Sequence, residues 1–222
     1  MKATLIALIF SLVSSPLLAE SAMTQDQAYS YTMGVRLGEL LKGQDIKDID
    51  IDAFALAIGD VLKERELRLS NEEMISAVRA QQAKEREKRD LQAEENKKIG
   101  AKFLAENANK PGVETLPSGL QYRVITQGNG PKPSANSKVS VHYRGTLING
   151  TEFDSSYSRG APSNFSLKGV IPGFSEALSR MPQGSKWQVF IPGEMAYGKR
   201  GVGGDIGPNE TLIFEMELLE IL

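Results

Sequence analysis

Asp154 is the residue whose type and setting first suggest chemistry. It directly follows Phe153 at the end of a segment with strand-like alternation, so a carboxylate is expected beside an apolar face. Its charge could act on a bound group. Alternatively, it could cap the turn that begins at Ser155, since Asp often bonds nearby backbone N–H groups. Apolar residues that could surround it, as a pocket or simply as the core, are Tyr143, Phe153, Val170, Ile171, Phe174, Trp187, Tyr197 and Phe214.

The composition excludes several kinds of catalytic site. The chain has no cysteine, which excludes a disulfide framework, a thiolate nucleophile and a thiolate metal site. It has one histidine, His142, which we interpret as structural because no partner for acid–base catalysis is apparent. The net charge of −2 gives no basic excess for nucleic acid. We therefore expect no metal, no cofactor and no nucleic-acid partner.

The segment around Asp154 has the pattern of a β-hairpin. Residues 139–143 alternate apolar and polar side chains, as a half-buried strand does. Asn149 and Gly150 then predict a tight type I′ turn, because both residue types tolerate a positive φ. The chain returns from this turn to Asp154.

More strands and one short helix are predicted after residue 111. The further alternating segments are 120–124, 187–191 and 212–218. Phe174, Leu178 and Met181 are four and three residues apart, which predicts a short helix with one buried face, beginning near Pro172. Several strands with one helix on one face indicate an α+β domain over residues 111–222.

Residues 1–19 have the features of a secretory signal. Lys2 gives a positive start, an apolar run follows, and Ala19 is a small residue suited to cleavage. The apolar run is too short to span a bilayer, and an uncleaved apolar anchor is the alternative. We expect export to the periplasm, with the mature chain either free there or associated with the outer membrane.

Residues 20–69 are predicted to form a helical dimerisation domain. One helix covers about 24–42 and stops at Gly43, and a second starts at an N-cap at Asp52 and runs to about Leu62. A unit of about fifty residues rarely buries enough surface to be stable alone. We expect these helices to pair with a second copy of the chain, and packing onto the C-terminal domain is the alternative.

Residues 70–110 are predicted to form a long charged linker helix. Ser70 and Glu73 match a capping box. No proline follows before Asn107, and such a helix would extend roughly 55 Å at 1.5 Å per residue. Its middle has opposite charges four residues apart and few apolar side chains, which is typical of a solvated helix between domains.

Five motifs follow one another in the C-terminal half. They are Val141-His142-Tyr143, Gly150 to Ser156, Gly169-Val170-Ile171-Pro172-Gly173, Ala196-Tyr197-Gly198 and Pro208 to Phe214. Their order and spacing resemble the FKBP-type peptidyl-prolyl cis-trans isomerases over roughly residues 113–222. The signal and the helical N-terminal parts resemble the macrophage infectivity potentiator (Mip) subgroup of bacterial dimers. This resemblance implies a twisted antiparallel sheet wrapped on a short helix, joined by a long helix to an all-α N-terminal dimerisation domain.

The resemblance also implies a set of site residues. Those implied for catalysis are Asp154, Tyr197 and Tyr143, and those implied for substrate binding are Phe153, Arg159, Val170, Ile171, Phe174, Ile206 and Phe214. Phe174 stands where the family usually has Trp on the pocket floor. Ser163 and Asp205 replace apolar residues of the family, so we expect these three positions to affect substrate preference and macrolide affinity.

The implied reaction requires no nucleophile. Amide resonance sets a barrier of about 18–20 kcal/mol to rotation of an X–Pro bond. The enzyme has only to bind the twisted amide better than the planar one. A dry aromatic pocket favours the less polar twisted form. The resemblance implies that the Ile171 N–H and the Tyr197 hydroxyl bind substrate carbonyls, while Asp154 acts by its charge or by ordering nearby donors.

We therefore predict an exported, homodimeric prolyl isomerase that acts on proline-containing unfolded or partly folded proteins and binds the macrolide inhibitors of the family. Two other functions remain open at this point. One is a holdase chaperone that binds chains without needing the isomerase reaction. The other is a surface factor that contacts a host.

Overall fold

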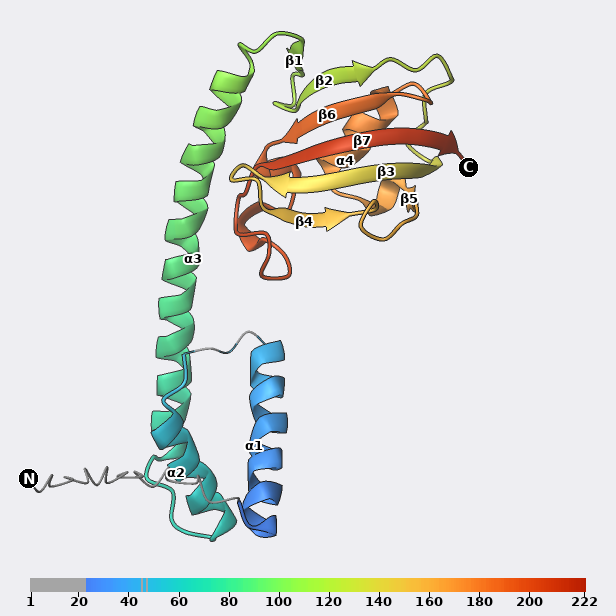
Figure 1. Cartoon of the computed structure of the whole chain (residues 1–222). Helices are drawn as coiled ribbons and strands as arrows, with labels where there is room; N and C mark the ends of the chain where they lie inside the picture. The colour runs from blue at the N-terminus through green and yellow to red at the C-terminus, as the bar shows by residue number, and fades with distance from the viewer. Residues whose placement is uncertain (1–22, 45, 47) are drawn as a thin grey trace, which may run out of the picture. The chain divides into compact units, whose positions relative to one another are not determined.

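The computed structural model describes residues 23–44, 46 and 48–222 (Figure 1). The predicted signal at 1–19 lies outside the described residues. The chain divides into two compact units, Met1–Arg65 and Glu66–Leu222. In the part of the chain that is described, no helix has the length and apolar character needed to cross a membrane.

The first unit contains helices α1 (Gln25–Gly43) and α2 (Ile51–Leu62). The predicted N-cap of α2 at Asp52 is wrong: the cap is Asp50, whose Oδ1 accepts from the Ala53 N–H at 2.9 Å. Asp52 instead lies in the first turn, where its negative charge interacts favourably with the helix dipole. None of the side chains of α1 is buried in the single chain.

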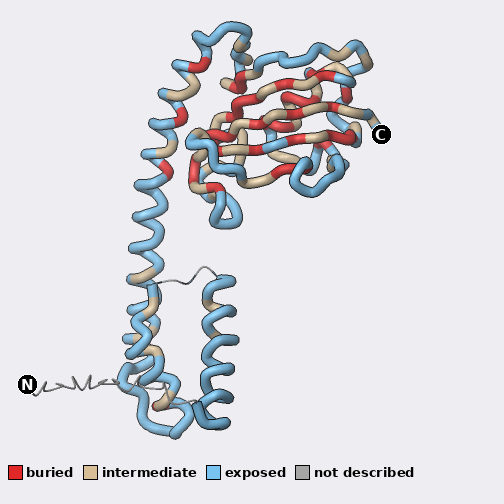
Figure 2. Tube along the Cα trace, viewed as in Figure 1, coloured by how far each residue is buried: buried red, intermediate tan, exposed pale blue. Residues whose placement is uncertain are grey.

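Helix α3 (Asn71–Asn107) opens the second unit. The predicted capping box is confirmed: the Glu73 N–H donates to Ser70 Oγ at 3.3 Å, and the Ser70 N–H donates to Glu73 Oε2 at 2.8 Å. Before Ala93 the helix is almost entirely exposed, as predicted for a solvated helix (Figure 2). The segment from Ala93 to Asn107 is different, because Ala93, Gly100 and Asn107 are buried.

Among the described residues, seven strands form one antiparallel sheet with the order β1-β2-β6-β7-β3-β4, and β5 also pairs with β3 (Figure 1). The strands are β1 (Val113–Thr115), β2 (Gln121–Thr126), β3 (Lys138–Leu147), β4 (Glu152–Ser155), β5 (Ser163–Ser166), β6 (Lys186–Ile191) and β7 (Leu212–Ile221). The two longest strands, β3 and β7, lie side by side in the middle of the sheet. The predicted α+β fold is confirmed.

The β3–β4 turn is not the predicted type I′ turn. Gly150 has a φ of 86°, but Asn149 is not among the residues with positive φ. The Gly150 N–H donates to the Leu147 carbonyl at 3.0 Å, and the Leu147 N–H donates to the Thr151 carbonyl at 2.9 Å. This pattern is a three-residue loop in which a left-handed glycine follows a tight turn. Asn149 uses its side chain instead, since its Oδ1 accepts from the Thr151 N–H at 2.9 Å.

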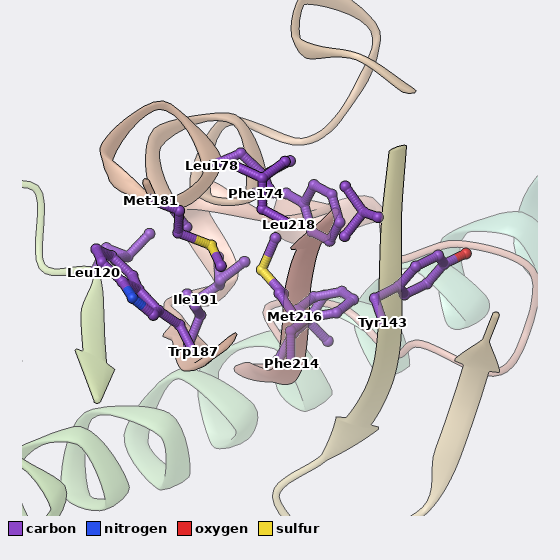
Figure 3. Packing of buried hydrophobic residues seen from close by; sticks show 14 of the residues in the cluster. Leu120, Tyr143, Phe174, Leu178, Met181, Trp187, Ile191, Phe214, Met216 and Leu218 are labelled. Carbon is purple, nitrogen blue, oxygen red and sulfur yellow. The ribbon is translucent and has the colours of Figure 1, made fainter. Parts of the chain in front are cut away.

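The core lies between one face of the sheet and the short helix α4 (Pro172–Arg180) (Figure 3). Phe174, Leu178 and Met181 point from this helical segment into the core, as their spacing predicted, and Pro172 begins the helix. The other face is partly covered by the end of α3, where the rings of Phe103 and Phe190 are 5.9 Å apart. In the described sheet domain, single-turn 3₁₀ helices lie in the connections: η1 (Leu167–Gly169), η2 (Gly193–Met195) and η3 (Gly198–Arg200).

Candidate active site

A cavity of about 430 Å³ opens at the edge of the core between the sheet and α4. Its walls are mainly aromatic and aliphatic, with carboxylates from two aspartates. The lining residues are Tyr143, Phe153, Asp154, Phe165, Gly169, Val170, Ile171, Phe174, Tyr197, Val202, Gly203, Asp205, Ile206 and Phe214. They come from strands β3, β4, β5 and β7, from the start of α4 and from the loop before β7.

The aromatic rings of the cavity pack edge to face. The ring centroids of Phe174 and Phe214 are 5.2 Å apart, and those of Phe153 and Phe214 are 5.6 Å apart. Tyr143 meets the edge of Phe174 at 5.9 Å, and Figure 3 shows its hydroxyl pointing away from the core residues. Such pairs hold each ring in a defined orientation. Phe174 is 4% exposed and Phe214 is 4% exposed, so the inner wall is rigid and dry.

Gly145 makes room for two of these rings. It lies on β3 opposite Phe214 on one side and Asp154 on the other. A Cβ atom at this position would lie 2.5 Å from Phe153 Cζ and 2.8 Å from Phe214 Cε1. Atoms of real side chains do not approach so closely, so both rings depend on a glycine here.

Asp154 is held by a network of donors rather than by the turn alone. Its carboxylate accepts from the Tyr143 hydroxyl at 2.5 Å and from the Arg159 guanidinium, with which it forms an ion pair. Arg159 also donates to the Tyr143 hydroxyl oxygen at 2.7 Å and to Ser163 Oγ at 3.1 Å. The Ser155 backbone also donates to this carboxylate, as expected for an Asp that caps the turn at Ser155.

The network sets the protonation of its members. Burial raises the pKa of Asp154, but the hydrogen bonds from Tyr143 and Arg159 outweigh it and hold this pKa below its ordinary value. Burial, and then the hydrogen bond to Asp154, raise the pKa of Tyr143. At neutral pH Asp154 is therefore an anion and Tyr143 a neutral hydroxyl donor.

Two cavity-lining residues have donors for which the described residues supply no acceptor. Ile171 is the N-cap residue of α4, and no group of the described residues accepts its N–H. The first N–H groups of a helix lack intrahelical partners, and Pro172 cannot supply a donor in its place. The Tyr197 hydroxyl likewise has no hydrogen-bond partner among the described residues. Burial, followed by the charge of Asp154, raises the pKa of Tyr197, so it remains a donor at neutral pH.

Comparison with known proteins identifies the family. Residues 130–219 match the model of the FKBP-type peptidyl-prolyl cis-trans isomerase, and residues 26–124 match the model of the domain amino terminal to it. The outer membrane protein MIP of Legionella longbeachae is 45% identical over 207 residues, which are 91% of this chain and 88% of that protein. This chain belongs to the FKBP-type peptidyl-prolyl cis-trans isomerases. It is therefore an enzyme that catalyses rotation about X–Pro bonds.

Other relatives of this isomerase agree with the family assignment. The peptidyl-prolyl cis-trans isomerase Mip of Coxiella burnetii is 42% identical over 202 residues, covering 89% of this chain and 87% of that protein. The crystal structure of FkpA from Escherichia coli matches with a TM-score of 0.64 and 37% identity, covering 89% of this chain and 97% of that chain. The likeness thus includes the helical N-terminal part as well as the sheet domain.

Most predicted site residues of the isomerase lie around one cavity, with two differences. Arg159 does not line the cavity; it stands behind Asp154 and Tyr143 and holds them. Trp187, considered above with the pocket aromatics, is a core residue that stacks on Tyr122 with ring centroids 4.3 Å apart. Strand alternation placed Trp187 on a buried face, but it could not tell the closed core from the cavity wall.

Some lining residues were not predicted. Phe165 is the clearest, because its ring lies 5.6 Å from that of Phe174 and its backbone pairs with Val139. A single aromatic in the four-residue strand β5 gives too short a pattern to be recognised. Gly169, Val202 and Gly203 also line the cavity. They lie in connections, which have no periodic pattern of apolar residues.

Proposed function

We propose that this cavity binds the proline ring of a polypeptide and holds the X–Pro bond in its twisted form. The observation that carries the proposal is the combination of a dry aromatic wall with free donors at its edge. The inner rings of Phe174 and Phe214 are nearly inaccessible to water. The cavity of about 430 Å³ has room for a proline ring and the peptide groups beside it.

The proposed catalysis follows from the polarity of the amide. A planar amide has charge separated by resonance, and rotation removes that resonance. Moving the bond from water into an apolar site therefore disfavours the planar form more than the twisted one. Because only interactions that are stronger in the transition state raise the rate, this difference lowers the barrier without any covalent step.

The polar groups at the edge are assigned to substrate carbonyls. In this proposal the Ile171 N–H binds one carbonyl of the substrate, and the Tyr197 hydroxyl binds a second. Asp154 is an anion fixed by Tyr143 and Arg159, so it presents a constant negative potential beside the rotating bond. No proton is transferred, which fits a carboxylate whose pKa is lowered.

A protease-coupled assay on X–Pro peptides tests these roles. Tyr197→Phe removes one hydroxyl, and loss of one hydrogen bond predicts a decrease in kcat/KM of about 2- to 10-fold. Asp154→Leu removes the anion and should cause a larger decrease. Gln127→Ala is a suitable control, because Gln127 is exposed and bonds only its neighbouring backbone. Wild-type rates in both site variants would contradict the assignment.

The proposed substrates are proline-containing unfolded or partly folded proteins outside the cytoplasm. The features of a signal at residues 1–19 support export, and a relative is called an outer membrane protein. The periplasm, with or without attachment to the outer membrane, is the proposed location. Macrolides that inhibit members of the family are proposed to enter the same cavity. Fractionation of cells that express the full chain tests the location, and recovery from the cytoplasm would contradict it.

A homodimer through the N-terminal helices is proposed from their exposed apolar residues. In the single chain, Tyr29, Tyr31 and Leu40 of α1 are between 57% and 68% exposed. Exposed apolar residues gathered on one element suggest an interaction surface. Sedimentation of the full chain should therefore give a dimer, and Leu40→Asp should shift it toward the monomer. A monomeric wild-type protein at micromolar concentration would contradict the proposal.

A further inference from the structure

The buried face of α3 packs against residues 208–211, the segment that leads from the cavity into β7. Gly100 of α3 lies against Thr211, and a Cβ atom at position 100 would be only 2.3 Å from Thr211 Oγ1. Thr211 is 2% exposed. A side chain of any size on Gly100 would separate the helix from this segment, so the contact is close.

Two amide side chains fasten the same segment to the helix. Asn96 Nδ2 donates to the Pro208 carbonyl at 2.8 Å, and Asn209 Nδ2 donates to the Ala93 carbonyl at 3.2 Å. Asn209 is 5% exposed and has a φ of 54°, in the left-handed region that asparagine tolerates better than most residues. Pro208 is also buried, so its carbonyl would find little water if Asn96 were lost.

This fastened segment is linked directly to one wall of the cavity. The Asn209 N–H donates to the Gly198 carbonyl at 2.8 Å, next to Tyr197. Val202 and Ile206 exchange two backbone hydrogen bonds, at 2.9 Å and 3.2 Å. Tyr197, Val202 and Ile206 all line the cavity. Two hydrogen bonds of Asn209, one to Ala93 and one to Gly198, therefore connect α3 to the residue next to Tyr197.

The loop that carries this wall has little rigidity of its own. Gly201, Gly203 and Gly204 all have positive φ values, between 61° and 78°. Glycine has the widest choice of backbone conformations, so such a loop needs fixed ends to hold one shape. One end is held at Gly198 by Asn209, and the other follows the buried Ile206 into the segment bound by α3.

We propose that α3 is a structural part of the isomerase site, and that Asn96 is a positioning residue for the wall formed by Tyr197, Val202 and Ile206. The helix then does more than join two domains, because its segment from Ala93 to Asn107, which packs on the sheet domain, fixes the position of the Tyr197 hydroxyl. This inference rests on the proposed function of Tyr197 as a substrate donor.

The test uses the full chain labelled with 3-fluorotyrosine, with the Tyr197 fluorine signal assigned by its loss in Tyr197→Phe. Asn96→Asp has nearly the same shape, but a carboxylate cannot donate and repels the Pro208 carbonyl. We expect this variant to shift the Tyr197 signal and to lower kcat/KM for X–Pro peptides by about 2- to 10-fold, the range for one lost hydrogen bond. Asn96→Gln retains a donor and should recover most of both properties.

Asn107→Ala is the matched control. Asn107 Nδ2 donates to Gln121 Oε1 at 2.9 Å, so this variant also loosens α3 from the sheet, but at the other end of the contact. It should lower the unfolding temperature while leaving the Tyr197 signal and kcat/KM unchanged. Equal changes in both properties for Asn107→Ala and Asn96→Asp would overturn the inference, since general loosening would explain them.

Two further results also overturn it. One is a wild-type Tyr197 signal together with wild-type kcat/KM in Asn96→Asp. The other is a shifted signal with unchanged kcat/KM, which removes the link to catalysis. In that case Tyr197→Phe decides whether the proposed function of Tyr197 has failed: an unaffected kcat/KM there locates the error in that role, whereas a lowered one shows that the role stands but does not depend on Asn96.

Discussion

Replacing Gly145 with alanine should reduce isomerase activity by pushing aromatic rings into the cavity. The added methyl group would lie 2.5 Å from Phe153 Cζ and 2.8 Å from Phe214 Cε1. Carbon atoms in contact are normally about 3.5–4.0 Å apart, so the rings must move by about 1 Å. Phe214 is 4% exposed and packed against Phe174, whereas Phe153 is half-buried. Phe153 should therefore move, toward the open cavity.

The size of the effect follows from the cost of overpacking. Inserting one extra carbon into a packed site costs about 1–3 kcal/mol. If this cost falls on the proline-binding step, it corresponds to a decrease in kcat/KM of about 5- to 150-fold. Because Phe153 can yield toward solvent, the loss of stability should be at the low end of that range, while the loss of activity should be at the high end.

Two measurements on the same samples separate these effects. A protease-coupled assay gives kcat/KM, and thermal unfolding followed by near-UV circular dichroism gives the stability. Gly130→Ala is the control, because its Cβ would lie 2.8 Å from the Gln183 Cβ, a similar clash away from the cavity. This control should lower the unfolding temperature and leave kcat/KM near the wild-type value. A folded Gly145→Ala protein with kcat/KM within twofold of wild type would refute the reasoning.

Three other predictions follow from the site and from α3. The lowered pKa of Asp154 means that its ionised form stabilises the fold above the ordinary carboxyl pKa of about 3.9, and that this stability is lost as the pH falls through the lower folded value. The unfolding temperature of the wild type should thus fall more steeply in that acidic window than that of Asp154→Asn; parallel curves would contradict it. Asp205 lines the cavity, so Asp205→Asn should reduce the preference for Lys over Glu before proline by about 1.5- to 5-fold, and 1 M salt should abolish the difference; an unchanged Lys/Glu ratio would count against this role. Ser70→Ala should weaken the start of α3 by about 0.5–2 kcal/mol, measured as faster hydrogen exchange at the Glu73 N–H that Ser70 accepts from, and an unchanged exchange rate would exclude the cap.

Much of the fold could be predicted because its elements have strong local patterns. The capping box at Ser70 and the spacing of Phe174, Leu178 and Met181 gave a helix start and a buried helix face that the structure confirms. Patterns of this kind depend on residues a few positions apart. They fix the type of element, and the resemblance to the family then placed most of the cavity residues together.

What the sequence did not reveal depends on contacts between distant segments. Asn149 and Gly150 predicted the wrong turn, because the register of β3 and β4 requires a three-residue loop. The sequence predicted that α3 is solvated along its length. Residues that bind it to the sheet domain, such as Gly100 and Asn96, are small or polar and form no apolar stripe. The docked face recurs every seven residues at Ala93, Gly100 and Asn107, but small and polar residues at this spacing do not read as an apolar stripe.

The central place of β7 has a consequence for how the domain is made. β7 pairs with both β6 and β3, yet residues 212–221 are synthesised after every other strand of the sheet. Until they are available, β3 and β6 have no common neighbour, and the two halves of the sheet remain unjoined. Such distant pairings are slow to form. A nascent chain that has not yet reached residue 212 should therefore remain open to proteases and chaperones, and should acquire its resistance in a single late step.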